Sequence, residues 1–306
     1  MEKRGHQVRL VSPDAFRSVP CPTYPEIRLA LFPGRGVARA IEDFDPQAIH
    51  IATEGPLGVA ARAHCLKKGY PFTTAYHTRF PEYIHARVPL PLGWLYAVMK
   101  WFHGPSSAIM VATQTIEDDL VARGFKPPVR RWSRGVWTDL FKPRDKAFLD
   151  GPRPISLFTG RVAVEKNIEA FLKLDLPGTK YVVGDGPQLD DLKRKYPDVR
   201  FAGMREGEDL AKYFAAADVF VFPSRTDTFG LVLLEAMASG VPVAAYPVPG
   251  PLDVVNQSGA GVLDDDLGKA VEAALAIPAE TCRAHALKYS WDASFDQFEG
   301  NLHVFR

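Results

Sequence analysis

The chain has 306 residues, of which 46% are hydrophobic and 24% charged, and its formal net charge at pH 7 is +1. This length predicts two domains with a sizeable core, and the balance of residue types is typical of globular proteins. A net charge so close to zero argues against a nucleic-acid partner. The three cysteines are far apart and lack metal-ligand spacing, which is typical of a reducing compartment.

The first half of the chain alternates strand-like and helix-like runs. It opens with QVRLVS, which predicts a strand over 7–12, followed by a long proline-rich loop over 13–34. The next predicted elements are a helix at 36–44, a strand at 48–53, a helix at 56–69, strands at 71–77 and 106–113, a helix at 114–124 and a closing segment at 128–136.

A second series of the same kind begins after Pro143. Its predicted elements are strands at 154–160, 180–186, 199–203, 218–224 and 242–247, and helices at 165–174, 187–196, 207–217 and around Glu235. Short strands that alternate with helices predict parallel sheets covered on both faces. We therefore expect an α/β protein with two Rossmann-like domains, at residues 1–142 and 143–288, and a linker near 137–153.

The front of the first series is unusual. A doubly wound domain opens with an apolar strand, a tight glycine turn and a helix, whereas the first strand predicted here starts a few residues after Met1. Residues 4–13 resemble the end of a first helix that runs into a second strand. We therefore expect the first strand–helix unit to be missing, through a truncated gene, a late start codon or divergence.

Two cations follow the first strand of the second series, in the stretch GRVAVEKN that starts at Gly160. Ligands of such sheets bind at the carboxyl ends of strands, where helix starts expose free N–H groups. Arg161 and Lys166 add two positive charges there, a combination that suits a diphosphate. The alternative is a solvated surface loop, and the stretch alone does not decide between the two.

The next strand ends in a turn that contains Gly184 and Gly186. These residues resemble a dinucleotide fingerprint without its third glycine, so a tight strand-to-helix turn is favoured over phosphate contact. The lack of a complete GxGxxG after a strand also disfavours a nicotinamide dehydrogenase.

Two carboxylates follow the strand at 218–224. Asp227 lies in the loop, and Glu235 lies about two turns into the next helix, among apolar neighbours where an unpaired carboxylate is costly. The ordinary alternatives are a helix N-cap for Asp227 and an exposed helical position for Glu235, the second being the poorer explanation. Hydroxyl-binding carboxylates beside phosphate-binding cations indicate a nucleotide sugar.

In the first half, His77 ends a predicted strand, which directs it into a cleft by the same rule. A single histidine is more often a structural residue, so His77 alone is a minority hypothesis. The basic turn at 132–136 lies where the halves meet, and a plain connecting turn explains it equally well.

Together these segments resemble glycosyltransferase family 4, retaining enzymes of the GT-B architecture, over residues 4–298. The segments that carry the resemblance are YHTRFPEY, RWSRGV, GRVAVEKN, VGDGP, ADVFVFPS and DTFGLVLLEAMASGVPVAA. The last corresponds to the family's two-carboxylate donor motif, and the whole is similar to bacterial GDP-mannose-dependent α-mannosyltransferases and glycolipid-forming relatives. The resemblance implies two parallel sheets that face a central cleft, with a C-terminal helix at 289–306 that crosses back to the first domain.

The resemblance also implies roles for the charged residues. Arg161 and Lys166 would hold the donor diphosphate, Asp227 would contact hydroxyls of the donor sugar, and Glu235 would bind the ribose. His77 would reach over the donor sugar from the acceptor-side domain. Since the basic residues and the helix termini would neutralise the leaving diphosphate, no metal and no other cofactor is expected.

Backbone groups complete the implied donor site. Those of Gly160, Phe229, Gly230 and Leu231 would face the sugar and the phosphates. The implied mechanism is front-face substitution, in which the acceptor hydroxyl attacks from the side that the diphosphate leaves and a diphosphate oxygen takes the proton.

The sequence departs from the family pattern at three places. Asp227 replaces the usual glutamate, and Trp137 stands where an aspartate usually follows GV. The third departure is the expected absence of the family's first strand and its glycine-rich loop, which puts the activity of the chain in doubt.

The segment 83–105 mixes the aromatic residues Trp94, Tyr96, Trp101 and Phe102 with the basic residues Arg87, Lys100 and His103. Packing of an ordinary core helix is the favoured explanation, and contact with a bilayer surface is the alternative. We expect a cytoplasmic protein, with peripheral contact to the inner face of a membrane as the further possibility.

The leading hypothesis is thus a hexosyltransferase that uses GDP-mannose or a UDP-hexose and a lipid or glycan acceptor. The alternatives are a GT-B sugar-nucleotide epimerase, for which no acid/base carboxylates were identified, and a non-catalytic nucleotide-sugar binder. The sequence leaves the base, the sugar, the acceptor and the oligomeric state open.

Overall fold

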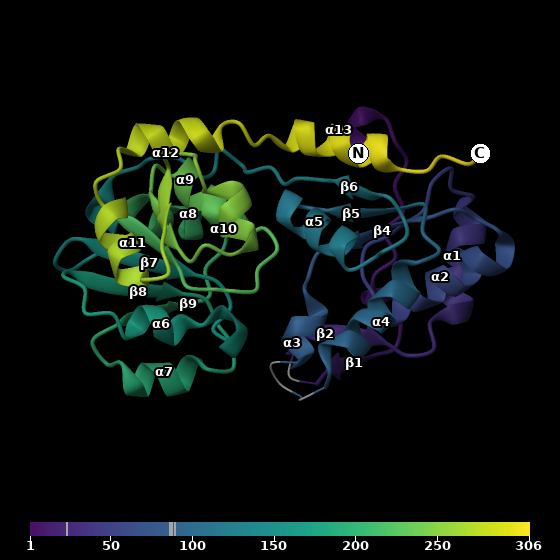
Figure 1. The fold of residues 1–306 in the computed structure, drawn as a ribbon, viewed down its shortest axis with the longest axis horizontal. Helices are drawn as coiled ribbons and strands as arrows, with labels where there is room; N and C mark the ends of the chain where they lie inside the picture. Colours follow the sequence, from purple (N-terminus) through teal and green to yellow (C-terminus); the bar gives the residue numbers. More distant parts are fainter. Residues whose placement is uncertain (23, 86–87, 89) are drawn as a thin grey trace. The chain divides into compact units, whose positions relative to one another are not determined.

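The structure is a computed structural model that describes residues 1–22, 24–85, 88 and 90–306. The chain divides into two compact units: unit 1 comprises Met1–Ser133 and Phe295–Arg306, and unit 2 comprises Arg134–Ser294. Each unit has its own parallel sheet and its own helices (Figure 1). The prediction of an α/β protein with two Rossmann-like domains is confirmed.

Unit 1 contains a four-stranded parallel sheet in the order β3-β4-β5-β6. Its strands and helices are β3 (His50–Ile51), β4 (Thr73–Tyr76), β5 (Ala108–Val111), β6 (Val129–Arg131), α1 (Gly34–Phe44), α2 (Pro56–Lys68), α3 (Phe80–His85), α4 (Leu92–His103) and α5 (Gln114–Ala122). Every residue of β4 and β5 is buried, as expected for central strands covered on both faces. Helix α2 ends at Gly69, which has a φ of 71°, because glycine adopts the left-handed conformation without steric cost.

The front of unit 1 differs from the prediction. Residues 7–12 form neither a strand nor a helix, so the strand predicted there is wrong. The predicted loop over 13–34 instead contains a 3-10 helix at Pro13–Ala15 and an antiparallel hairpin of β1 (Ser18–Cys21) and β2 (Tyr24–Ala30). Another short 3-10 helix precedes it at Glu2–Arg4. A hairpin closes its hydrogen bonds locally, whereas residues 7–12 pair with no strand in the part of the chain that the structure describes.

Unit 2 contains a six-stranded parallel sheet in the order β12-β11-β10-β7-β8-β9. Its strands are β7 (Ile155–Thr159), β8 (Thr179–Val183), β9 (Arg200–Gly203), β10 (Val219–Phe222), β11 (Val243–Ala245) and β12 (Gly261–Leu263). Its helices are α6 (Ile168–Leu172), α7 (Leu189–Lys195), α8 (Gly207–Ala216), α9 (Leu231–Ala238), α10 (Pro249–Val254), α11 (Leu267–Ala274) and α12 (Ala279–Ala286), with 3-10 helices η3 (Lys146–Phe148) and η4 (Val164–Lys166). Helix α13 (Trp291–Asn301) contains the boundary between the units.

Residues 134–142 belong to unit 2, whereas the sequence analysis grouped them with the first domain. The Arg283 guanidinium on α12 donates to the carbonyl oxygens of Thr138 and Phe141 at 3.0 and 2.6 Å. At Gly135, an added Cβ would lie 2.4 Å from the backbone nitrogen of Trp291. These contacts tie the segment to the end of unit 2, and they are too distant in sequence for a local pattern to reveal.

Candidate functional site

The turns after β7 and β8 pack against each other through glycine backbone. Gly160 follows β7 and has a φ of 143°, and Gly184 follows β8 and has a φ of 139°. A Cβ added to Gly184 would lie 1.9 Å from the Gly160 carbonyl oxygen, and one added to Gly186 would lie 2.4 Å from the Val162 carbonyl oxygen. Close backbone approach thus accounts for the glycines of VGDG, and it positions the turn that carries Arg161 and Lys166.

Replacement of Gly184 with alanine is expected to destabilise unit 2 by about 2–4 kcal/mol, because it adds both left-handed strain and a backbone clash. Chemical denaturation measures the change. The control is Gly300→Ala in α13, where an added Cβ meets no heavy atom within 4 Å and the gain in helix propensity favours folding. Equal effects of the two replacements would contradict this account of Gly184.

A salt bridge joins η4 to the loop after β10. Lys166 Nζ lies 2.6 Å from Asp227 Oδ1, and the two side chains are only 21% and 16% exposed. The other oxygen, Asp227 Oδ2, is buried and has no hydrogen-bond partner among the described residues. Since a buried acceptor without a partner is costly, a ligand hydroxyl at this oxygen would remove an energetic penalty.

The loop that carries Asp227 is fastened to η4 by further hydrogen bonds. The Asn167 amide donates to the Pro223 carbonyl oxygen at 3.1 Å, and the Thr226 hydroxyl donates to the Glu165 carbonyl oxygen at 3.3 Å. On the other side, the Gly250 N–H at the start of α10 donates to the Asp227 carbonyl oxygen at 3.4 Å. The two strand ends that the sequence analysis linked through a ligand are therefore also linked directly.

A second carboxylate lies beside Arg161, and the sequence analysis did not identify it. Glu165 Oε1 is 3.9 Å from Arg161 Nε, and the Glu165 side chain is only 3% exposed. The spacing of four residues between opposite charges was the available signal. Each predicted diphosphate-binding cation thus has a carboxylate within 4 Å.

Helix α9 begins at Leu231, with Gly230 as its N-cap at a φ of 80°. Asp227 is therefore not the N-cap, and that alternative is wrong. Phe229 is buried, and Leu231 is partly exposed at the first helical position. Because the helix starts later than predicted, Glu235 lies about one turn into it, not two.

Glu235 is partly buried on α9, among the fully buried side chains of Leu234 and Ala236. Desolvation raises the pKa of its carboxyl to about 7. Near neutral pH the group therefore divides between its neutral and ionised forms. The exposed helical position considered for Glu235 is thus wrong, and a ligand that donates hydrogen bonds would stabilise the ionised form.

His77 belongs to unit 1, while the other predicted site residues belong to unit 2. It follows β4, and its ring centroid lies 5.2 Å from that of Trp132. The Trp132 ring also lies 4.6 Å from Phe298 of α13 and 5.7 Å from His50. His77 is thus held at the end of its strand by an aromatic cluster within unit 1.

The charged residues of YHTRFPEY form a network that the sequence analysis missed. Arg79 Nη2 lies 3.0 Å from Glu82 Oε1 and 3.5 Å from Asp119 Oδ2. The Tyr96 hydroxyl donates to Glu82 Oε1 at 2.6 Å. These contacts hold α3 against α4 and α5, and the (i, i+3) pair of opposite charges was the signal for the first of them.

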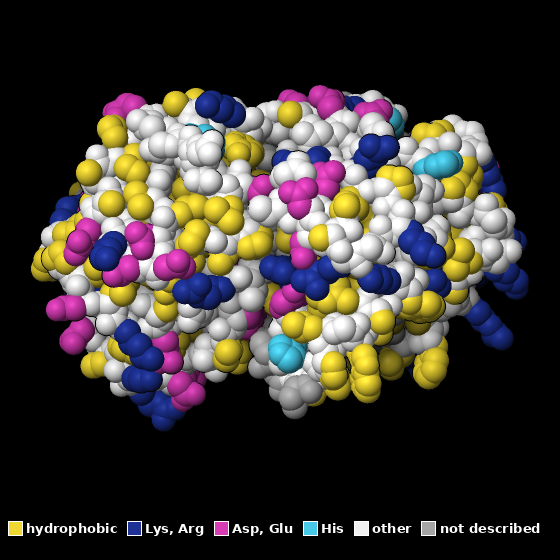
Figure 2. Space-filling view, in the orientation of Figure 1, with side chains coloured by type: hydrophobic (Ala, Val, Ile, Leu, Met, Phe, Trp, Pro, Cys, Tyr) yellow, Lys and Arg dark blue, Asp and Glu magenta, His cyan; other side chains and the backbone are white. Residues whose placement is uncertain are grey.

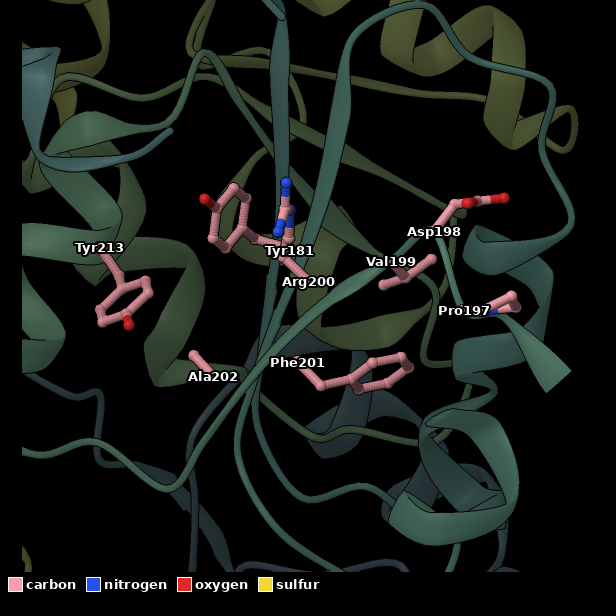
Figure 3. Close-up of a pocket in the computed structure, with 8 residues that line it drawn as sticks. All are labelled: Tyr181, Pro197, Asp198, Val199, Arg200, Phe201, Ala202 and Tyr213. Atoms are coloured by element: carbon pink, nitrogen blue, oxygen red, sulfur yellow. The ribbon is translucent and has the colours of Figure 1, made fainter. Parts of the chain in front are cut away.

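A groove of about 470 Å³ lies elsewhere in unit 2, along the edge strand β9 (Figure 3). Tyr213 of α8 lies at one end of the group and Pro197 at the other, with Arg200 and Phe201 between them (Figure 3). The lining includes no residue of 160–167 or 227–235, so this groove is separate from the candidate site. Among the described residues, no three His, Cys, Asp or Glu side chains are grouped to hold a metal ion.

Each half of the chain matches a glycosyltransferase family model. The model of Glycosyltransferase Family 4 matches residues 1–140, and that of Glycosyl transferases group 1 matches residues 153–277. Two solved structures share the fold. Sucrose-phosphate synthase from Thermosynechococcus elongatus has a TM-score of 0.70 and 22% identity, and the match covers 94% of this chain and 85% of that one. HepE from Anabaena in complex with UDP has a TM-score of 0.69 and 17% identity, and the match covers 86% of this chain and 80% of that one.

Among the relatives, the sulfoquinovosyl transferase of Arabidopsis thaliana is 31% identical over 80% of this chain, which spans about half (51%) of that protein's length. The GDP-mannose-dependent alpha-mannosyltransferase of Mycolicibacterium smegmatis is 30% identical over 87% of this chain and 77% of its own length. The alpha-monoglucosyldiacylglycerol synthase of Streptococcus pneumoniae is 27% identical over 100% of this chain and 79% of its own length. The chain belongs to glycosyltransferase family 4, with the GT-B fold.

Proposed function

We propose that this chain transfers a hexose of the mannose or glucose type, with retention, from a nucleotide-diphosphate sugar to a lipid or glycan acceptor. The names of its relatives support the donor and acceptor classes, since one is GDP-mannose-dependent and another is a glucosyldiacylglycerol synthase. Action at the inner face of a membrane is part of the proposal.

The observation that carries the proposal is the partly buried Lys166–Asp227 pair with an unsatisfied carboxylate oxygen. A diphosphate would compete with Asp227 for the Lys166 ammonium, because a phosphate carries more charge than a carboxylate. Asp227 would then accept hydrogen bonds from sugar hydroxyls at both oxygens. In this proposal the salt bridge exists without the donor. When the donor binds, its diphosphate takes the place of Asp227 beside Lys166, and its sugar hydroxyls take the place of Lys166 beside Asp227.

The remaining groups surround the same donor in this proposal. Arg161 grips the diphosphate beside Lys166, and the first N–H groups of α9, after Phe229 and Gly230, add the partial positive charge of a helix start. Glu235, about one turn further, accepts from the ribose hydroxyls. Backbone groups of Gly160 and Leu231 face the phosphates and the sugar, while His77 acts on the sugar from unit 1.

The chemical step that we propose is front-face substitution. The bond between the anomeric carbon and the diphosphate oxygen breaks, and the acceptor hydroxyl oxygen bonds to the same face of that carbon. The hydroxyl proton passes to the leaving diphosphate, so the products are the glycoside and the nucleoside diphosphate. Arg161 and Lys166 stabilise the charge that develops on the leaving group, and no metal ion takes part.

Calorimetry with GDP and UDP, beside a donor-hydrolysis assay with and without a chelator, tests the proposal. We expect one nucleotide to bind, its sugar derivative to be turned over and the chelator to leave the rate unchanged. Binding without turnover would favour the non-catalytic binder, and release of an epimerised sugar nucleotide would favour the epimerase. If neither nucleotide binds, the donor site is wrong.

A further inference from the structure

Helix α4 divides its aromatic side chains between the core and the solvent. Tyr96 and Phe102 are buried, as core packing predicts, whereas Trp94 is 71% exposed and Trp101 is 53% exposed. Val98, also 53% exposed, lies between the two tryptophans at helical spacing. The helix therefore presents an apolar stripe of Trp94, Val98 and Trp101 on the side away from its core contacts.

A second apolar group lies on the hairpin and the loop that follows it. Val19 of β1 and Ile27 of β2 are exposed, and so is Leu31. Phe32 is 96% exposed and has a φ of 50°, a conformation that is uncommon for residues other than glycine. A phenylalanine held outward at an energetic cost indicates a function outside the protein's own core.

These apolar groups lie in basic stretches of sequence. Residues 83–116 contain no Asp or Glu, and residues 15–41 contain four arginines and one glutamate. Arg17, Arg28 and Arg35 are exposed, and so is Lys100 beside the stripe on α4. The Arg62 guanidinium lies 4.1 Å from the centroid of the Trp101 ring. Large apolar side chains with cations around them match the surface of an anionic bilayer.

Figure 2 shows apolar side chains that project along the lower edge of unit 1, below the place where Figure 1 draws α4 and the β1–β2 hairpin. Among the described residues, every helix is too short or too polar to cross a bilayer. Insertion to the depth of the headgroups requires only side chains, and tryptophan is favoured at that depth.

We propose that the α4 stripe and Phe32 form a docking surface that inserts into the headgroup region of a membrane rich in anionic lipid. The occupant is the lipid surface itself, because basic residues flank both apolar groups. The inference deepens the proposed action at a membrane face and rests on it, but it concerns unit 1 alone and is independent of which nucleotide sugar the donor site takes.

Vesicle flotation tests this proposal, with vesicles of phosphatidylcholine alone and with phosphatidylglycerol added. We expect the full chain to float with the anionic vesicles at low salt and to bind less as salt rises. Trp94→Ser/Trp101→Ser is expected to weaken binding by roughly tenfold for each tryptophan. Arg35→Gln/Lys100→Gln is expected to weaken it by about fivefold for each cation.

The control is Val304→Ser, which removes an apolar side chain that is 64% exposed in the C-terminal segment, at the opposite edge of unit 1 from the hairpin in Figure 1. Its binding should equal that of the unchanged chain. Circular dichroism and thermal unfolding should be unaltered in the tryptophan variant, because both rings are more than half exposed.

Three results of the vesicle experiment would overturn the proposal. The first is no binding to anionic vesicles, the second is equal binding to phosphatidylcholine alone, and the third is undiminished binding by the tryptophan variant. If sedimentation without vesicles reveals a dimer that the tryptophan variant abolishes, the occupant is a second copy and the lipid assignment is wrong. Calorimetry with GDP and UDP on the same preparations separates this failure from failure of the donor site.

Discussion

Replacement of Lys166 with alanine is expected to slow sugar transfer by about 10²–10³-fold, the usual cost of one group that stabilises charge in a transition state. Lys166 lies in η4 and Arg161 in the turn that precedes it, and we propose that both neutralise the leaving diphosphate. Steady-state transfer from the donor identified by calorimetry measures the effect, and Arg161→Ala should behave similarly. Near-normal turnover by either variant would refute its assignment.

The control for Lys166→Ala is Lys173→Ala, which removes a lysine that is 62% exposed in the same unit and should leave the rate unchanged. A slower rate could also arise from damage to the fold, since Lys166→Ala leaves the Asp227 carboxylate without its cation. A further variant separates this cause from a loss of diphosphate binding. The variant Lys166→Ala/Asp227→Asn removes both charges. Affinity for the nucleoside diphosphate is the readout, because that ligand lacks the sugar that Asp227 is proposed to contact. If the salt bridge acts only in folding, the second change restores this affinity; if Lys166 binds the diphosphate, the affinity stays low.

Unit 2 was predictable from sequence because its central strands are buried on both faces. Such strands are continuous apolar runs, as in β7 and β10, where every residue is buried. Turn glycines and charged helices separate them, so type and order of the elements follow from local pattern. The predicted strand at 154–160, for example, is β7 at Ile155–Thr159.

The front of unit 1 was not predictable in the same way. Prolines in 13–34 indicated a loop, but Pro20 lies within β1, a position that an isolated two-stranded hairpin tolerates because an edge N–H needs no partner. The run at 7–12 has the composition of a strand, yet composition does not supply a neighbouring strand. Strand formation there depends on a partner rather than on the residues themselves.

The site shows the same division between local and distant contacts. Position at a strand end predicted Arg161, Lys166 and Asp227 as neighbours of one ligand, and the contact between Lys166 and Asp227 is confirmed. The direct bond between Lys166 and Asp227 spans 61 residues, and no local pattern encodes it. Glu165 was missed because its burial depends on packing.

Ionisation of Glu235 is expected to oppose folding. Burial raises the pKa from 4.5 to about 7, so the folded chain binds more protons than the unfolded chain between these values. The contribution of Glu235 to the free energy of unfolding should therefore be most favourable below about pH 4.5 and should fall as the pH rises to about 7. Glu235→Gln removes the effect, so the variant should gain about 1–3 kcal/mol relative to the unchanged chain between pH 5 and pH 8.

Nucleotide binding should show the opposite pH dependence if Glu235 accepts hydrogen bonds from the ribose. The ionised carboxylate is the acceptor, so affinity should rise with pH and level off above about 7, changing by about tenfold per unit below that value. Glu235→Gln should lose the pH dependence and bind about 10–100-fold more weakly, the cost of hydrogen bonds to a charged group. Calorimetry between pH 5.5 and pH 8.5 measures both, and a 2′-deoxy nucleotide is the matched ligand control. Because stability and affinity change in opposite directions with pH, a general loss of folding cannot imitate the result. An affinity that is independent of pH in the unchanged chain would remove Glu235 from the ribose site.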